Sequence, residues 1–401
     1  MSEARGGGTD VVSAPAPTSP APSPSRGTPA GPAAGPGAAW STATTVALYV
    51  VSLAVAFGIS ALLVALTHGS PSKVFTAMYD GSIRSFGSLG YTLDNAAPLM
   101  IVAVGAIVST RAGLFNIGQE GQVAIGAMAG AFVALKVHPA GPPVLVLALL
   151  AAAVGGALWA GIVALLRYWR GVEVVISSLL LVFVAEQVVF YALSRDFLLR
   201  EHGAGGATLT ESDQLSSKVQ LPHIGTYPHF NFGSGLLIAL ALAAAVGLVM
   251  TRTTAGFRIR MLGYNPVAAK HVGIRAAWLG SVALLVSGAC AGLAGGVLLT
   301  GQAYRITPTI SGNVGWNGLL VALVARNNAW VAIGVAIGFG ALQAGGGFLS
   351  TTGVPTDLVN VIEALVVLAA VFPPALQEVM RRRGRRVPAP TPASAIPGVA
   401  G

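Results

Sequence analysis

The sequence predicts an all-α fold: a polytopic integral membrane helix bundle of about ten transmembrane helices, with interrupted or half-spanning segments and both termini cytoplasmic. Of its 401 residues, 54% are hydrophobic and only 9% are charged, a balance that water-soluble chains of this length do not have. Apolar stretches long enough to cross a bilayer recur along the chain. The basic residues lie in short loops beside these stretches rather than on one continuous surface, so the net charge of +9 predicts no nucleic-acid partner.

Two polar tails flank the predicted membrane domain, which covers residues 40–373. Residues 1–39 are rich in Pro, Ala, Gly, Ser and Thr and carry too few large apolar side chains to offset the entropy of ordering. They are predicted to form a disordered cytoplasmic tail. Residues 374–401 combine five arginines with a Pro-rich end. They are predicted to form a second cytoplasmic tail, with arginines that can contact anionic membrane lipid.

Ten apolar stretches are predicted to be the spans. They cover residues 46–66, 93–109, 114–135, 144–166, 174–193, 235–250, 277–300, 314–325, 329–347 and 357–372. The eighth stretch is too short, because twelve helical residues rise only ~18 Å against a hydrocarbon core of ~30 Å. It is predicted to be a half-helix or to be extended by irregular backbone.

The orientation of the bundle follows from its basic residues, because Lys and Arg concentrate on the cytoplasmic side of short loops. With the N-terminus inside, 16 of the 23 Lys and Arg residues fall inside and seven fall outside. This topology places residues 194–234 in a long external loop and residues 251–275 in the cytoplasm. The external loop is predicted either to meet an external partner or to be a spacer.

The basic segment 251–275 is predicted to contain a short helix. Asn265 can cap its start, Pro266 suits the first helical position, and Gly273 can end it in a left-handed conformation. A helix of about two turns is too short to be stable alone in water. The segment is therefore interpreted either as a docking helix for a cytoplasmic partner or as a solvated loop whose charges only set the topology.

Two polar interruptions share one spacing, N-x-G-x-x-G. The first is formed by Asn116, Gly118 and Gly121, and the second by Asn313, Gly315 and Gly318. In the predicted topology the helices that follow them run in opposite directions. Inverted repeats of this kind place broken helices, with their partly positive N-termini, around a substrate path. The alternative is that the glycines only allow helices to approach closely, as is also expected of Gly126 and Gly130 and of Gly288, Gly292 and Gly296.

Polar side chains within spans are costly unless they face protein or water, and this makes them candidates for a solute path. The predicted path residues are Asn116, Gln119, Glu120, Gln122, Glu186, Asn313, Asn317, Gln343 and Glu363. For each of them, a hydrogen bond that only holds the bundle together is the alternative.

Enzyme signatures are absent from the sequence. No Gly-Lys dipeptide occurs, so there is no phosphate-binding loop, and there is no H-E-x-x-H metal motif. The single cysteine, Cys290, excludes intrachain disulfides and cysteine-only metal sites. His223 and His229 lie in one external loop, but their spacing is weak support for a metal site. No catalytic residue, metal site or cofactor is predicted on this chain.

Five segments carry a family resemblance. They read RAGLFNIGQEGQ (111–122), VEVVISSLL (172–180), GYNPVAAKHVGI (263–274), SGACAGLAGG (287–296) and GVPTDLVNVIEALVVL (353–368). With them the chain resembles the permease subunits of bacterial ABC importers of the branched-chain amino acid and ribose type, in the branch that serves nucleosides and simple sugars. The first segment is the most specific and favours a nucleoside. The fifth span reads LLLVFVAEQ where the family usually has an Asn after a Met-Leu pair.

The resemblance implies a multi-pass permease in a bacterial cytoplasmic membrane. It implies cytoplasmic ABC ATPase subunits that bind ATP and Mg, a second permease chain, identical or sister, and an extracytoplasmic solute-binding lipoprotein. The family's coupling region corresponds to Arg260, Gly263, Asn265, Pro266, Ala268, Ala269 and Gly273. The alternatives are a ribose-like sugar as solute, a secondary transporter with proton sites at Glu120, Glu186 or Glu363, and a membrane scaffold or enzyme.

Overall fold

The computed structural model describes residues 42–66, 70–195, 197–201, 210–225 and 230–351, with scattered positions between 361 and 379. The predicted N-terminal tail and Glu363 lie outside these residues, as do parts of the predicted tenth span and most of the C-terminal tail. The described chain is almost entirely helical, which confirms the predicted fold class.

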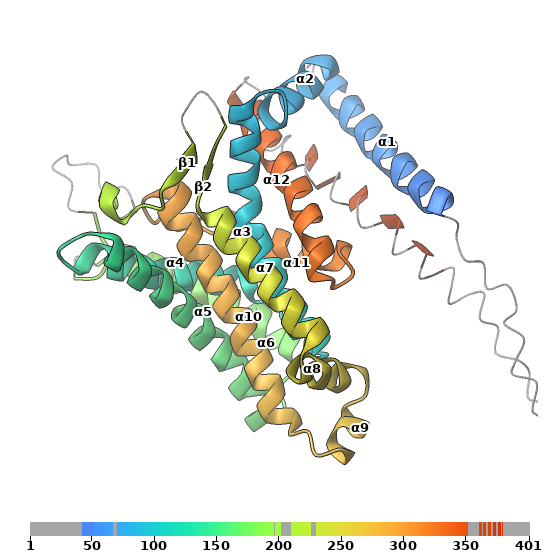
Figure 1. Ribbon diagram of the computed structural model, residues 1–401. Helices are drawn as coiled ribbons and strands as arrows, with labels where there is room; N and C mark the ends of the chain where they lie inside the picture. The colour runs from blue at the N-terminus through green and yellow to red at the C-terminus, as the bar shows by residue number, and fades with distance from the viewer. Residues whose placement is uncertain are drawn as a thin grey trace, which may run out of the picture.

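Twelve α-helices follow one another along the described chain (Figure 1). They are α1 (Thr42–Leu66), α2 (Pro71–Ser82), α3 (Phe86–Arg111), α4 (Gln119–Lys136), α5 (Pro142–Arg170), α6 (Val174–Leu193), α7 (Gly235–Arg252), α8 (Thr254–Tyr264), α9 (Pro266–His271), α10 (Ala276–Leu298), α11 (Val314–Val324) and α12 (Ala329–Thr351). A π-helical turn, η2 (Leu299–Ala303), continues α10, and a 3-10 turn, η1 (Ser217–Val219), lies before a hairpin. The hairpin pairs β1 (His223–Gly225) with β2 (Asn231–Gly233) in antiparallel register.

Seven of the described helices are long and apolar enough to cross a membrane: α1, α3, α5, α6, α7, α10 with η2, and α12. The remaining two predicted spans within the described ranges differ from these. Helix α4 has 18 residues and begins with Gln119, Glu120, Gly121 and Gln122, whereas α11 has only 11 residues. The structure thus confirms the predicted short helix at 314–325, which follows an irregular stretch from residue 304 to residue 313.

Helix α3 lies at the centre of the bundle and is the most buried of the seven long helices. Helix α10 packs against it, and α4, α5 and α10 pack against one another at very short range. A Cβ atom added at Gly126 would lie 2.3 Å from Gly292 Cα, and one added at Gly156 would lie 2.3 Å from the Gly288 carbonyl oxygen. The predicted close approach at Gly126, Gly288 and Gly292 is therefore confirmed, with Gly156 of α5 as a partner that the sequence analysis missed.

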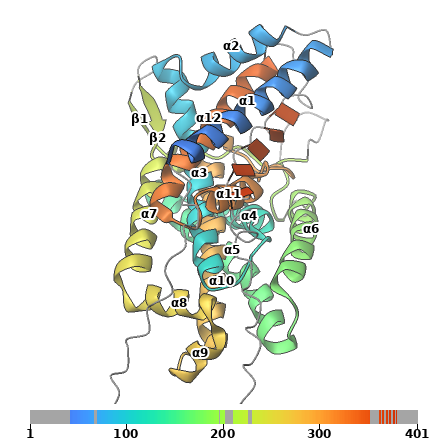
Figure 2. The same ribbon diagram turned by 90° about the vertical axis from the view of Figure 1, so that its right-hand side faces the viewer.

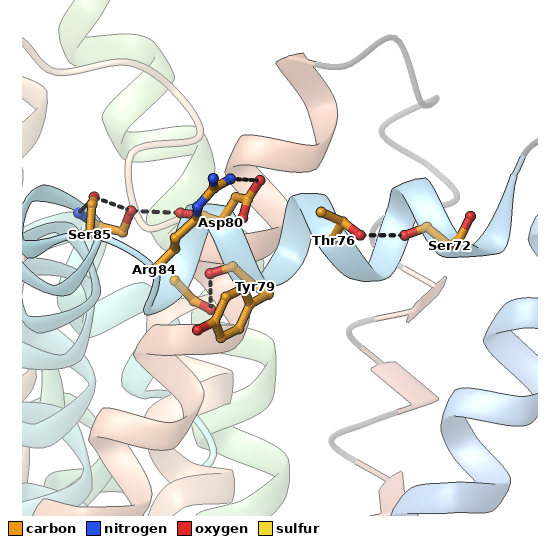
Figure 3. Close-up of polar contacts among 8 residues, drawn as sticks. Ser72, Thr76, Tyr79, Asp80, Arg84 and Ser85 are labelled. Atoms are coloured by element: carbon orange, nitrogen blue, oxygen red, sulfur yellow. Dashed lines mark hydrogen bonds and ion pairs between the residues drawn. The ribbon is translucent and has the colours of Figure 1, made fainter.

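Helix α2 was not predicted, because its twelve residues include no long apolar run. A set of polar contacts holds its end against the start of α3 (Figure 3). The Ser85 hydroxyl accepts a hydrogen bond from Ser88 N–H, and the Ser88 hydroxyl donates to the Asp80 carbonyl at 2.6 Å. Arg84 forms an exposed ion pair with Asp80 at 2.8 Å, which adds little stability by itself. These contacts fix the turn between the two helices.

The two loops that the topology separates lie at opposite ends of the bundle. Helices α8 and α9, from the predicted cytoplasmic segment, lie at the lower end, whereas the β1–β2 hairpin from the predicted external loop lies at the upper end with α2 (Figures 1 and 2). The hairpin is held to α3 by the Asp94 carboxylate, which accepts from Gly233 N–H at 2.5 Å. His223 Nε2 lies 3.9 Å from the same carboxylate, and His229 lies outside the described residues.

Candidate functional site

The two N-x-G-x-x-G segments meet inside the bundle. Helix α4 begins at Gln119 after an irregular stretch, 112–118, and α11 begins at Val314 after another, 304–313. A Cβ atom added at Gly315 would lie 2.3 Å from Glu120 N and 2.4 Å from Glu120 Cα. The first turns of the two helices are therefore in backbone contact, about halfway between the ends of the bundle (Figure 2).

Glu120 of α4 caps the N-terminus of α11 across this contact. One carboxylate oxygen accepts from Asn313 N–H at 3.0 Å, and the other accepts from Gly315 N–H at 2.7 Å and Trp316 N–H at 3.3 Å. The first N–H groups of a helix have no partner within it and carry partial positive charge. The Glu120 side chain, which belongs to a residue only 5% exposed, thereby gains the hydrogen bonds that a buried carboxylate requires.

A buried amide cluster surrounds the approach to α4. Asn116 Nδ2 donates to Gln122 Oε1 at 3.0 Å and to Ser287 Oγ of α10 at 3.2 Å, and Gln119 Nε2 donates to the same hydroxyl at 3.1 Å. Asn116 Oδ1 accepts from Gly118 N–H at 3.1 Å. The three predicted path residues in this cluster are fully buried. In this structure Asn116 and Gln119 both join the start of α4 to α10 through Ser287.

A cavity of about 490 Å³ lies beside Glu120. Its lining residues are Glu120, Glu186, Gln187, Phe190, Pro308, Thr309, Ser311, Gly312 and Asn313. Three predicted path residues, Glu120, Glu186 and Asn313, thus share one cavity although they come from α4, α6 and the chain before α11. Its volume lies in the range of small-molecule sites.

The cavity offers hydrogen-bond acceptors and one aromatic ring. Two carboxylates and the Gln187 amide face it together with hydroxyl groups, while Phe190 contributes a flat apolar surface. None of the described residues that line it is a Lys or Arg. An anionic solute would find no charge partner there and would be repelled by the carboxylates. A neutral solute with several hydroxyl groups fits this lining better.

The other predicted path residues do not line this cavity. Asn317 in α11 and Gln343 in α12 are half-buried elsewhere. Sequence reasoning missed some of the lining residues, namely Phe190, Pro308, Thr309, Ser311 and Gly312. Phe190 could have been found, because it lies four residues after Glu186 and therefore on the same face of α6. The chain at 308–312 has no periodic signal and is placed only by tertiary packing.

The predicted caps of the basic segment are confirmed. Asn265 Oδ1 accepts from Ala268 N–H at 3.0 Å, Pro266 is the first residue of α9, and Gly273 has a left-handed φ of 82°. Helix α8, which the sequence analysis did not separate, precedes α9 and is itself capped by Thr253. Tyr264, at the corner between the two helices, is 83% exposed.

The corner between α8 and α9 contacts the chain that leads into α4. A Cβ atom added at Gly263 would lie 2.2 Å from the Arg111 carbonyl oxygen and 2.9 Å from Gly113 N. The Arg111 guanidinium donates from two nitrogens, at 3.0 and 2.8 Å, to the Asn327 carbonyl in the turn that follows α11. The basic segment is thus in direct contact with residues that connect to both short helices.

Comparison with known proteins identifies relatives over most of the chain. The family model described as branched-chain amino acid transport system / permease component matches residues 88–371. The glucose ABC transporter permease protein TsgB13 of Haloferax volcanii is 33% identical over 329 residues, which are 80% of this chain and 85% of that protein. The guanosine ABC transporter permease protein NupP of Bacillus subtilis is 29% identical over 338 residues (83% and 95%). The nucleoside ABC transporter permease protein NupB of Lactococcus lactis is 26% identical over 323 residues (79% and 88%). No solved structure matches the chain.

Proposed function

This chain belongs to the permease family of branched-chain amino acid transport systems, and we propose that it forms the membrane path of an ABC importer whose solute is a nucleoside. It is a multi-pass membrane protein and a transport subunit. The observation that carries the proposal is the cavity beside Glu120, where the N-terminus of α11 meets α4. We place the importer in a bacterial cytoplasmic membrane.

The chemistry of this cavity supports a nucleoside over an amino acid. The Glu186 carboxylate can accept hydrogen bonds from ribose hydroxyls, and the Phe190 ring can stack on a base. A branched-chain amino acid would bring a carboxylate of its own, and no basic side chain lines the described cavity to receive it. Two of the relatives above are named for guanosine or nucleosides. The alternative solute is a simple sugar, which is favoured by the identity to the glucose permease.

Competition during uptake tests this proposal. We would reconstitute the chain with its ATPase, a second permease chain, identical or sister, and its receptor, and measure uptake of a labelled nucleoside in the presence of unlabelled competitors. Excess nucleoside is expected to suppress uptake, whereas nucleoside monophosphate, leucine and ribose leave it unchanged. Uptake of labelled ribose or glucose, with no uptake of the nucleoside, would establish the sugar alternative. Uptake that continued without the ATPase and stopped when the proton gradient was collapsed would support a secondary transporter instead.

Coupling to ATP hydrolysis is proposed to pass through α8 and α9. ATP and Mg would be bound by separate ATPase subunits, which contact α9 in the cytoplasm. Movement of α8 and α9 would press Gly263 against the backbone at Arg111 and Gly113. The chain from 112 to 118 would transmit this movement to α4. Because Glu120 holds α11, both short helices would shift together. A second permease chain would complete the path, and a solute-binding lipoprotein would dock at the end that carries the β-hairpin.

Replacing Asn265 by Ala together with Pro266 by Gly is expected to weaken ATPase docking while the bundle stays folded. The change at Asn265 removes the cap of α9, which is worth about 1 kcal/mol. The change at Pro266 frees a backbone that the proline ring restrains. Co-purification of the ATPase and receptor-stimulated ATP hydrolysis measure the effect.

Asn328→Ala is the matched control for this change. Asn328 Oδ1 accepts from Trp330 N–H at 3.0 Å in the first turn of α12, so a similar cap is lost outside α9. This variant is expected to retain the ATPase. Normal co-purification and stimulated hydrolysis in the Asn265 and Pro266 double variant would contradict the docking role.

A further inference from the structure

A second cavity, unrelated to the one at Glu120, opens between α5 and α10. It has a volume of about 710 Å³. Five residues of α5 and two of α10 line it: Gly161, Ala164, Leu165, Tyr168, Trp169, Ser281 and Leu285. Both helices are long enough to span the membrane, and Leu165 and Trp169 are 57% and 69% exposed. We call this cavity the α5–α10 groove.

Close contacts on both sides of this groove explain why it exists. On one side Gly156 touches the backbone of α10 at Gly288 and Gly292, and on the other the Tyr168 hydroxyl lies against Gly280. Small residues between these contacts, such as Gly161 and Ala164, do not fill the space. The hollow is therefore built by the two helices themselves, whose packing places it toward the end that carries α8 and α9.

Three arginines lie at the end of α5 and α10 nearest the groove. Arg167 and Arg170 are in the last turn of α5, and Arg275 immediately precedes α10. Since α5 and α10 run antiparallel, with Gly156 opposite Gly288 and Tyr168 opposite Gly280, the three arginines lie at the same end. All three are exposed. The Arg170 guanidinium stacks over the Trp169 ring at 4.5 Å.

No carboxylate of the described chain lies within ion-pair distance of these three arginines. Glu173, the nearest acidic residue in sequence, starts the next helix and is exposed. This end of the two helices therefore carries uncompensated positive charge, and the Arg170 guanidinium contacts Trp169, which lines the groove. This combination matches a molecule with an anionic head and an apolar tail.

We propose that the α5–α10 groove binds an anionic phospholipid, with an acyl chain against Trp169 and Leu285 and the phosphate beside the arginines. Basic pockets between spanning helices on the cytoplasmic side bind anionic head groups. A second copy of this chain fits less well, because a two-fold contact would bring the same arginines face to face. The proposal depends on the membrane assignment of α5 and α10 and is independent of the solute and of ATPase coupling.

Quenching of Trp169 fluorescence by brominated lipid tests the site. The full permease complex is placed in phosphatidylcholine nanodiscs that contain a small fraction of lipid with brominated acyl chains, either phosphatidylglycerol or phosphatidylcholine. The contribution of Trp169 is obtained by difference from a Trp169→Phe variant. Brominated phosphatidylglycerol is expected to quench it at roughly one tenth of the mole fraction that brominated phosphatidylcholine needs.

Two charge variants determine whether the arginines are responsible. Replacing Arg167, Arg170 and Arg275 by Gln is expected to abolish the tenfold preference. The matched control replaces Arg252, Arg258 and Lys270 by Gln, which removes the same charge at the same end of the bundle but away from the groove, and it is expected to keep the preference. Equal quenching by both lipids in the unaltered complex, or a preference that survives in the first variant, would overturn the proposal. The quenching experiment does not measure solute uptake. Its result therefore leaves the transport proposal unaffected.

Discussion

Replacing Gly315 by alanine is expected to reduce solute uptake at least about tenfold. The added Cβ would lie 2.3 Å from Glu120 N, 2.4 Å from Glu120 Cα and 2.7 Å from Gln119 C. These are backbone atoms, so no side-chain rotation can relieve the contact. Overpacking of this kind costs about 1–3 kcal/mol, and each 1.4 kcal/mol corresponds to a factor of about ten.

Gly334→Ala provides the control for this prediction. Gly334 lies within α12, and beyond the neighbouring backbone of its own helix no heavy atom lies within 4 Å of the position its Cβ would take. Alanine is favoured over glycine in a helix by about 1 kcal/mol, so Gly334→Ala is expected to leave uptake unchanged and to raise thermal stability slightly. Size-exclusion chromatography separates lost transport from lost assembly. Full uptake by Gly315→Ala would mean that the contact between α4 and α11 is not needed.

Glu120→Gln is expected to lower uptake at least about tenfold while the permease still assembles with its ATPase. The side chain keeps its size, but an amide NH2 must now face one of the backbone N–H groups of Asn313, Gly315 or Trp316 that the carboxylate accepts. Hydrogen bonds to charged groups contribute about 1.5–3 kcal/mol, and a buried donor left without an acceptor costs a similar amount. The start of α11 would lose its anchor on α4.

Glu186→Gln removes a carboxylate from the same cavity without touching α11. Glu186 is exposed, and within the described part of the chain it holds no helix terminus. A smaller loss of uptake is therefore expected for Glu186→Gln, caused by weaker binding of the solute rather than by a shift of α11. Uptake rates and ATPase co-purification are compared for both variants. If Glu120→Gln transported normally, Glu120 would be a structural cap only, and if both variants lost uptake equally, the charge of the cavity would matter more than the cap.

These two predictions concern one arrangement that the sequence only outlined. The repeated N-x-G-x-x-G spacing allowed two interpretations, broken helices around a path or glycines that only permit close packing. The structure shows that both helices begin after irregular backbone. That Gly315 would lie against Glu120 was not predictable, because the two motifs are separated by almost 200 residues and their contact depends on how α3, α4, α10 and α11 pack together. The glycine spacing allowed a close approach but did not specify the partner.

The sequence alone determined the features that depend on short-range physics. Composition and the length of apolar runs determined the helical membrane fold, and the short run at 314–325 determined a helix too short to span. The cap at Asn265, the Pro266 start and the left-handed Gly273 each depend on neighbouring residues only, and all three are present. Helix α2 escaped prediction because amphipathic helices without a long apolar run resemble loops in composition.

Only the tertiary structure decided which polar residues of α4 face a cavity. Gln119 and Gln122 are three residues apart and share one helix face, whereas Glu120 is rotated by about 100° from Gln119. The sequence therefore showed two faces, but the packing of α10 against one and of α11 against the other gave them different surroundings. Gln119 and Gln122 became part of a buried cluster near Ser287, and Glu120 received the N-terminus of α11 beside the cavity. The faces of a helix are set by its local geometry, but what each face meets is set by contacts between segments far apart in the chain.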